Sequence, residues 1–117
     1  MKEIARKALL YDFYGELLTE HQKKVYEDAA MNDFSLSELA EEYGISRQGI
    51  HDLLKRCDAI LEDYEEKLGL IKRFTDVKSI ADEMQITLND LPEASTKAKR
   101  EEIAETLNEK INKIREI

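Results

Sequence analysis

Apolar residues recur at steps of three and four along most of the chain, the spacing that places them on one side of an α-helix. No stretch shows the alternation of β-branched and polar residues that is typical of strands. Glycine occurs only four times and proline once in 117 residues. The pattern therefore predicts an all-α protein.

The first helix is predicted over residues 2–18, where apolar side chains cover so much of the circumference that more than one neighbour is expected. A second helix is predicted over about residues 20–32, because Thr19 and Gln22 have the spacing of a capping box. Asn32 and Asp33 favour turns and are expected to end it.

Residues 34–57 predict two helices joined by a tight turn. Ser35 and Glu38 form a second capping box, Gly44 supplies the left-handed residue of the turn, and Ser46 caps the following helix. The offsets are those of a helix-turn-helix, with a small Ala40 where the helices cross and a branched Ile50 between them. The side chains expected to support Ile50 are Leu36, Leu39, Ile45 and Leu53.

The outward face of the second of these helices carries the candidate nucleic-acid site, since this helix enters the major groove in helix-turn-helix proteins. Arg47 can bridge the two acceptors of guanine, and Gln48 can pair with adenine. The backbone N–H of Ser46 can bind a phosphate at the helix N-terminus. The predicted contacts to DNA or RNA are Ser46, Arg47, Gln48, His51, Lys55 and Arg56, with Lys23 and Lys24 as additional phosphate contacts.

The charge balance leaves a second hypothesis open. The chain has 26 acidic and 18 basic residues, a formal net charge of −8. Within residues 35–57 the acidic residues also outnumber the basic ones, whereas strong DNA binders concentrate positive charge. The alternative is therefore an adaptor, in which the helix-turn-helix contacts a basic protein or a ribonucleoprotein.

The apolar spacing of about 3.5 residues continues from Ile50 through Ile71, so the second helix is expected to extend, bent or unbroken, to about residue 88. The segment 89–92 ends it, because proline disfavours helix in the preceding residue. Ser95 or Thr96 then caps a last helix with a narrow apolar stripe. We accordingly predict a helix-turn-helix domain over residues 1–74 and a helical C-terminal extension over residues 75–117.

Residues 19–57 resemble region 4 of the sigma-70 family, which binds promoter DNA through its second helix. The whole layout, with the N-terminal segment 11–18, the helix-turn-helix and a charged helical C-terminal half, resembles the YlxM-like proteins of Gram-positive bacteria. That likeness is greatest over residues 8–73. It implies a cytoplasmic, non-catalytic DNA-binding regulatory protein associated with the signal recognition particle pathway, and signal recognition particle components as the adaptor's partners.

The remaining reactive groups indicate no enzyme, metal site or cofactor. Cys57 is the only cysteine and lies on the apolar stripe, which predicts a buried, inert thiol. His21 and His51 have no cysteine to complete a zinc site. The carboxylate run 62–66 is interpreted as a solvated helix face, and no glycine-rich phosphate loop is present.

Location and assembly are also predicted. The start of the sequence lacks a signal-peptide pattern and no apolar run is long enough for a membrane span, so the cytoplasm is expected. Leu9, Leu10, Phe13 and their neighbours give the first helix more apolar surface than a small helix-turn-helix can bury. We therefore expect a homodimer, with this N-terminal helix as the interface.

Overall fold

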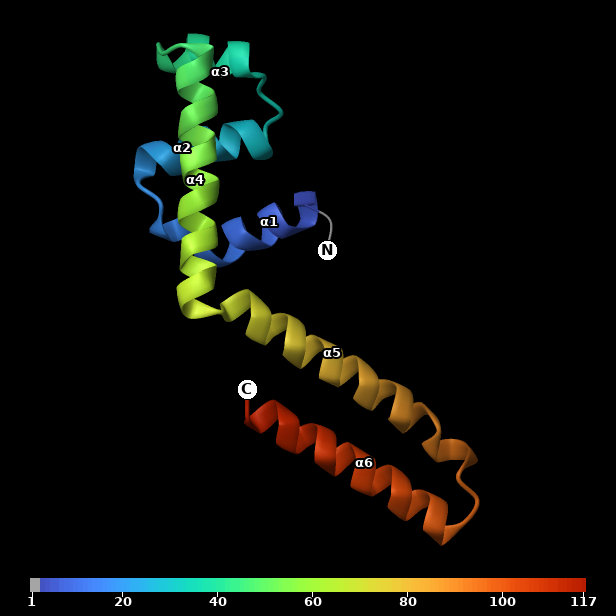
Figure 1. The fold of residues 1–117 in the computed structure, drawn as a ribbon. Coiled ribbons are helices and arrows are strands. Elements are labelled where there is room, and N and C mark those ends of the chain that lie inside the picture. The colour runs from blue at the N-terminus through green and yellow to red at the C-terminus, as the bar shows by residue number, and fades with distance from the viewer. Residues whose placement is uncertain (1–2) are drawn as a thin grey trace. The chain divides into compact units, whose positions relative to one another are not determined.

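Residues 3–117 are described by a computed structural model, in which they form α-helices and two short 3-10 turns and contain no strand (Figure 1). The chain divides into two compact units, one ending at Ile71 and the other comprising Lys72–Ile117. We call them the helix-turn-helix unit and the hairpin unit. The elements are α1 Glu3–Tyr14, η1 Gly15–Leu17, α2 Glu20–Ala30, α3 Leu36–Tyr43, α4 Arg47–Leu68, α5 Leu70–Asn89, η2 Leu91–Glu93 and α6 Lys97–Arg115. The all-α prediction is confirmed.

Local signals in the sequence set most helix starts. Both predicted capping boxes form, because the Thr19 hydroxyl accepts from the N–H of Gln22 at 3.2 Å and the Ser35 hydroxyl accepts from the N–H of Glu38 at 3.1 Å. At the start of α6 the cap is Thr96 rather than Ser95, with its hydroxyl accepting from Lys99 N–H. Each cap satisfies a backbone donor that the helix itself leaves unpaired.

Helix α4 is the central element of the helix-turn-helix unit, and α1, α2 and α3 all lie against it (Figure 1). Near its N-terminus it packs on α2 and α3 through a fully buried cluster of Val25, Leu39 and Ile50. Further along, a second buried cluster joins it to α1 and to the start of α5. Its members are Leu10, Tyr14, Leu18, Tyr26, Cys57, Leu61 and Ile71.

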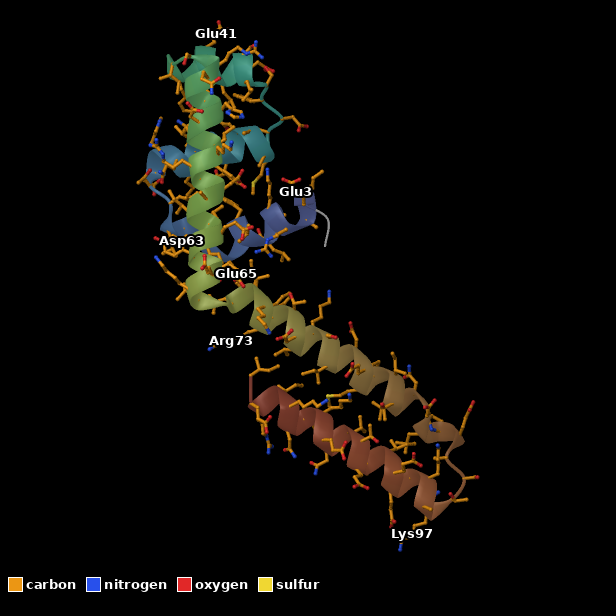
Figure 2. The ribbon with its side chains drawn as sticks, viewed as in Figure 1. Glu3, Glu41, Asp63, Glu65, Arg73 and Lys97 are labelled. Atoms are coloured by element: carbon orange, nitrogen blue, oxygen red, sulfur yellow. The ribbon has the colours of Figure 1, made fainter. Side chains whose placement is uncertain are left out.

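The predicted helical course to about residue 88 is confirmed, since α5 ends at Asn89, but it is divided into two helices because α4 ends at Leu68. Gly69 follows with φ +62°, the left-handed conformation that glycine adopts without a steric penalty. Beside this corner the Tyr14 hydroxyl donates to Glu65 Oε1 at 2.5 Å and accepts from the N–H of Leu70 at 3.1 Å. Glu65 Oε1 also accepts from the N–H of Ile71 at 2.9 Å, and it lies next to the corner (Figure 2).

These bonds also correct the interpretation of the carboxylate run 62–66 as a simple solvated face. Glu65 closes the corner between α4 and α5. Glu62 forms two hydrogen bonds of 2.7 Å with the guanidinium of Arg6, so it ties α4 to α1. Asp63 matches the prediction more closely, because it forms only an exposed pair with Lys67 one turn further along the same helix.

In the hairpin unit α5 and α6 run side by side in opposite directions (Figure 1). Arg73 and Lys97, near their respective starts, accordingly lie at opposite ends of the unit (Figure 2). Lys110 Nζ on α6 contacts Glu83 on α5 at 2.8 Å. No helix among residues 3–117 is long and apolar enough to cross a membrane.

Candidate nucleic-acid interface

The turn between α3 and α4 has the geometry that the sequence predicts. Gly44 adopts φ +66°, and the N–H of Ile45 donates to the carbonyl of Ala40 at 3.1 Å. The Ser46 hydroxyl then caps α4 by accepting from the N–H of Gly49 at 2.9 Å. Ile50 is fully buried between the helices, as expected. The structure therefore contains the predicted helix-turn-helix.

One of the residues expected to support Ile50 is placed differently. Leu39 is fully buried against Ile50, and Leu36 and Leu53 pack around the same cluster. Ile45, however, keeps 40% of its surface exposed in the turn. It therefore contributes little to the core beneath the candidate interface.

A tyrosine that the sequence analysis did not single out holds α3 in place. The Tyr43 hydroxyl donates to Asp28 Oδ2 on α2 at 2.5 Å, and its ring meets His21 edge-on at a centroid distance of 5.8 Å. Burial and the hydrogen bond to Asp28 raise the pKa of Tyr43 to about 12. The pKa of Asp28 is lowered by its hydrogen bonds from Tyr43 and Asn32. No local sequence pattern indicates this contact, because it joins residues 15 positions apart.

The predicted contact residues lie together on the first turns of α4, and all six are exposed: Ser46, Arg47, Gln48, His51, Lys55 and Arg56. The buried Ile50 and Cys57 fix one side of this part of α4 against the core, and the six side chains leave the helix around the rest of its circumference. The arrangement presents two guanidinium groups, one ammonium and one amide to solvent. These groups suit contacts to base edges and phosphates.

Asp52 lies within this surface and changes its chemistry. Gln48 Nε2 donates to Asp52 Oδ1 at 2.9 Å, and His51 Nδ1 is 3.6 Å from the same oxygen. The carboxylate thus engages one donor of the amide that was expected to read adenine. Its spacing of four residues from Gln48 is the signal that could have indicated this pair.

The basic side chains of the helix-turn-helix unit fall into two groups. Four of those that the structure describes are ion-paired, Arg6 with Glu62, Lys7 with Asp58, Lys23 with Glu16 and Lys67 with Asp63. By contrast, a second group has no carboxylate oxygen within 4 Å among residues 3–117. It consists of Lys24, Arg47, Lys55 and Arg56. Lys23 is therefore already engaged, at 2.6 Å from Glu16, whereas Lys24 stays available.

The charge of the whole unit has the opposite sign. Residues 1–71 contain 16 acidic and nine basic side chains, so they carry −7 of the formal net charge of −8. The helix-turn-helix itself also carries exposed carboxylates, such as Glu41 on α3 (Figure 2). A polyanion is therefore repelled by most of the unit and attracted only where unpaired basic side chains are exposed.

Cys57 is fully buried, and its pKa is raised by that burial. The predicted burial of this thiol is confirmed, and a raised pKa disfavours the thiolate, which is the nucleophilic form. On another side of the unit, α1, α2 and α4 enclose an apolar hollow of about 370 Å³. Ala8, Tyr11, Ala29 and Leu54 are among the residues that line it.

Comparison of the sequence with models of protein families shows the family to which the chain belongs. Residues 1–106 match the model of UPF0122, described as "putative helix-turn-helix protein, YlxM / p13 like". The chain belongs to the UPF0122 family. The resemblance to YlxM-like proteins is thereby confirmed, together with the helix-turn-helix that the family description names.

Three UPF0122 relatives illustrate the extent of the similarity. The chain is 40% identical over 114 residues to YlxM of Bacillus subtilis, covering 97% of each chain. It is 39% identical over 114 residues to a UPF0122 protein of Acetivibrio thermocellus, again with 97% of each chain covered. A UPF0122 protein of Thermoanaerobacter sp. strain X514 is 49% identical over 77 residues, which are 66% of each chain.

Proposed function

We propose that this UPF0122 protein is a non-catalytic regulatory protein that binds DNA, or RNA, through the N-terminal half of α4. The observation that carries the proposal is the distribution of ion pairs. In an acidic unit where Arg6, Lys7, Lys23 and Lys67 are neutralised by carboxylates, three of the four unpaired cations described are exposed on the N-terminal half of α4. Phosphate neutralisation by such cations supplies much of the affinity of nucleic-acid-binding proteins.

Roles within the site follow from the chemistry of each group. Arg47 and Gln48 occupy the first turn of α4, the part of a recognition helix that meets base edges. Lys55 and Arg56 lie two turns further along and suit phosphates, as does Lys24 on α2. The likeness of residues 19–57 to sigma-70 region 4 favours double-stranded DNA. The proposed site of action is the cytoplasm, where such a target is found in bacteria.

Binding measured over a salt series tests the proposal. Lys55→Ala should weaken binding to all sequences alike and reduce the slope of log K against log salt by about one. Arg47→Ala should cost about 1–3 kcal/mol on the preferred sequence and relax the preference at one base pair. The matched control is Lys67→Ala, on the same helix but paired with Asp63 at 2.8 Å, which should leave binding unchanged.

The contradicting result is equally specific. If Arg47→Ala and Lys55→Ala bind every nucleic acid as the wild type does, α4 is not the contact surface. Fragments from the gene's own neighbourhood and signal recognition particle RNA provide the two probes. Binding that persists unchanged from low to high salt would also contradict phosphate contacts.

A second candidate function is an adaptor for signal recognition particle components, and two observations favour it. The net charge of −7 on residues 1–71 suits a basic protein or ribonucleoprotein. The apolar hollow between α1, α2 and α4 could receive a side chain of such a partner, with Ile4 and Met31 exposed at its border. Loss of protein binding in Met31→Glu, with nucleic-acid binding retained, would support the adaptor.

A further inference from the structure

The hairpin unit lacks a core of its own. Of the residues Lys72–Ile117, all of which the structure describes, only Ile103 is buried. In proteins most of the stability of a helix comes from packing its apolar face against another element. The contact between α5 and α6 alone leaves Val77, Ile80 and Met84 only half-buried. Further apolar cover is therefore required.

Two pairs of exposed apolar residues lie on one side of the hairpin, whereas Ile86 lies on another. On α5, Ala81 and Leu88 follow the inward Val77 and Met84 by four residues, which places them about 40° further round the helix. On α6, Ala104 and Ile111 are displaced in the same sense from the half-buried Leu107, by about 60° and about 40°. Because the two helices are antiparallel, rotations in the same sense bring both pairs to the same side (Figure 1).

We call this surface the hairpin face and define it by Ala81, Leu88, Ala104 and Ile111. Leu88 and Ile111 are 44% and 37% exposed. A shallow hollow runs along its α6 side, lined by Ala104, Leu107 and Ile111 with two polar neighbours. Small residues alternating with large ones allow two such faces to approach closely and interdigitate.

The charges along α5 indicate what covers the hairpin face. The hairpin unit as a whole is nearly neutral, with nine basic and ten acidic residues, unlike the helix-turn-helix unit. Along α5 the basic residues Lys72, Arg73 and Lys78 all precede Ala81, together with a single acidic residue, Asp76, so this first half of the helix is positive. Asp82 and Glu83 follow it, and no basic residue lies in this second half of the helix. Such a helix is electrostatically complementary to an antiparallel copy of itself.

We propose that two copies of the chain associate through the hairpin face, with α5 antiparallel to its symmetry mate and the two helices closest at Ala81. The four helices then form a two-fold symmetric bundle, the arrangement that buries one apolar face of each hairpin. Lys78 of each copy approaches Asp82 of the other. The proposed interface is argued from the hairpin unit alone and does not depend on nucleic-acid binding by α4.

The proposal moves the dimer interface away from the N-terminal helix. The residues of α1 that gave rise to the earlier expectation are occupied within the protomer, since Leu10 and Tyr14 are buried in the core of the helix-turn-helix unit. Leu9 and Phe13 are partly buried and pack against the same core. Among the described residues of α1, Ile4 alone remains as a large, strongly exposed apolar side chain.

Light scattering of the full chain at tens of micromolar gives the first test. The wild type should have twice the monomer mass of 13.6 kDa. Leu88→Glu and Ile111→Glu should each convert it to the monomer, because a carboxylate would be buried in an apolar interface. The matched control is Ile86→Glu on the same helix, where Ile86 is 67% exposed and points away from the hairpin face, and it should remain dimeric.

Two further sets of variants keep the test decisive if a glutamate variant fails to fold, which circular dichroism would reveal. Under mild oxidation Ala81→Cys should form a disulfide-linked dimer, whereas Ile86→Cys should not, and the native Cys57 is too buried to interfere. Lys78→Glu should weaken the dimer, and the double variant Lys78→Glu, Asp82→Lys should restore it.

Three results would overturn the proposal. One is a monomeric wild type, which would indicate that the hairpin face packs against the same chain. Another is a dimer that resists both glutamate variants while Ala81→Cys fails to cross-link. The third is a dimer that Ile4→Glu dissociates and Leu88→Glu does not, since that pattern places the interface on α1.

Discussion

The helix-turn-helix unit and the hairpin unit are both helical, but different interactions hold their helices together. In the first, ten hydrophobic residues are buried among those that the structure describes, and hydrogen bonds from Tyr14, Tyr26 and Tyr43 link separate helices. In the second, Ile103 alone is buried, and the Lys110–Glu83 pair joins the two helices. Helical periodicity alone therefore does not distinguish a self-sufficient core from a surface that needs a partner.

The two units also suit different functions, recognition of nucleic acid in one and association with a second copy in the other. A surface that recognises nucleic acid must be held rigidly, and the candidate contacts lie on α4, whose opposite side is fixed by fully buried Ile50 and Cys57. A surface that associates with a second copy can remain incomplete in the single chain. The hairpin face meets that description, because Leu88 and Ile111 stay exposed.

The largest expected contrast is between two isoleucine truncations. Ile50→Ala should lower the free energy of unfolding by about 3 kcal/mol, because it leaves a cavity in the fully buried cluster of the helix-turn-helix unit. Ile86→Ala, on the hairpin unit, should cost less than about 0.5 kcal/mol. Urea unfolding followed by circular dichroism measures both. Equal losses of stability in the two variants would show that the two units do not differ in this way.

An intermediate effect is expected at the corner between α4 and α5. Tyr14→Phe removes the hydroxyl that donates to Glu65 and accepts from the N–H of Leu70, and should cost about 1–2 kcal/mol of stability. The neighbouring Tyr64 stacks on Tyr14 at a centroid distance of 6.0 Å. Tyr64→Phe preserves that stacking and should leave the urea midpoint unchanged. A similar loss in both variants would show that the hydrogen bonds at the corner are unimportant.

The smallest expected effect is on the stability of the protein at acidic pH. In the folded protein, hydrogen bonds from Tyr43 and Asn32 lower the pKa of Asp28 below its ordinary value of 3.8. The hydrogen bond from Arg6 similarly lowers the pKa of Glu62 below 4.5. Groups with a lowered folded pKa stabilise the fold above their unfolded pKa, and this contribution disappears as the pH falls through the folded pKa.

Stability should therefore decline as the pH falls below about 4.5. Tyr43→Phe should reduce that decline by removing the main cause of the Asp28 shift. Urea midpoints at neutral and acidic pH for the wild type and the variant measure it. An identical pH dependence in the two proteins would mean that the Tyr43–Asp28 bond does not persist in solution.

Local signals explain what could be predicted from the sequence. The caps at Thr19, Ser35 and Ser46 and the left-handed Gly44 all act within a few residues, so they are visible in the chain itself. The outward orientation of Arg47 and its neighbours also follows from helical periodicity once Ile50 faces inward.

Long-range contacts explain what could not be predicted. The helix break at Gly69 lies beside Glu65 and Leu70, which hydrogen-bond to Tyr14 more than 50 positions earlier. The apolar spacing continues across the break, because Ile71 still belongs to the core. Likewise, only the fold shows that Lys23 reaches Glu16 while Lys24 has no carboxylate within 4 Å among the described residues. Such differences depend on tertiary neighbours, so sequence spacing alone does not reveal them.

We propose that the helix-turn-helix unit is stabilised by its own core and the hairpin unit by association with a second copy of the chain. Hydrogen exchange of the full chain at about 1 and about 100 µM tests it directly, since only association depends on concentration. Amides of α2, α3 and α4 should be equally protected at both concentrations, whereas protection in α5 beyond Ile71 and in α6 should rise with concentration. Protection of the hairpin unit that is the same at both concentrations and matches that of α4 would contradict the account.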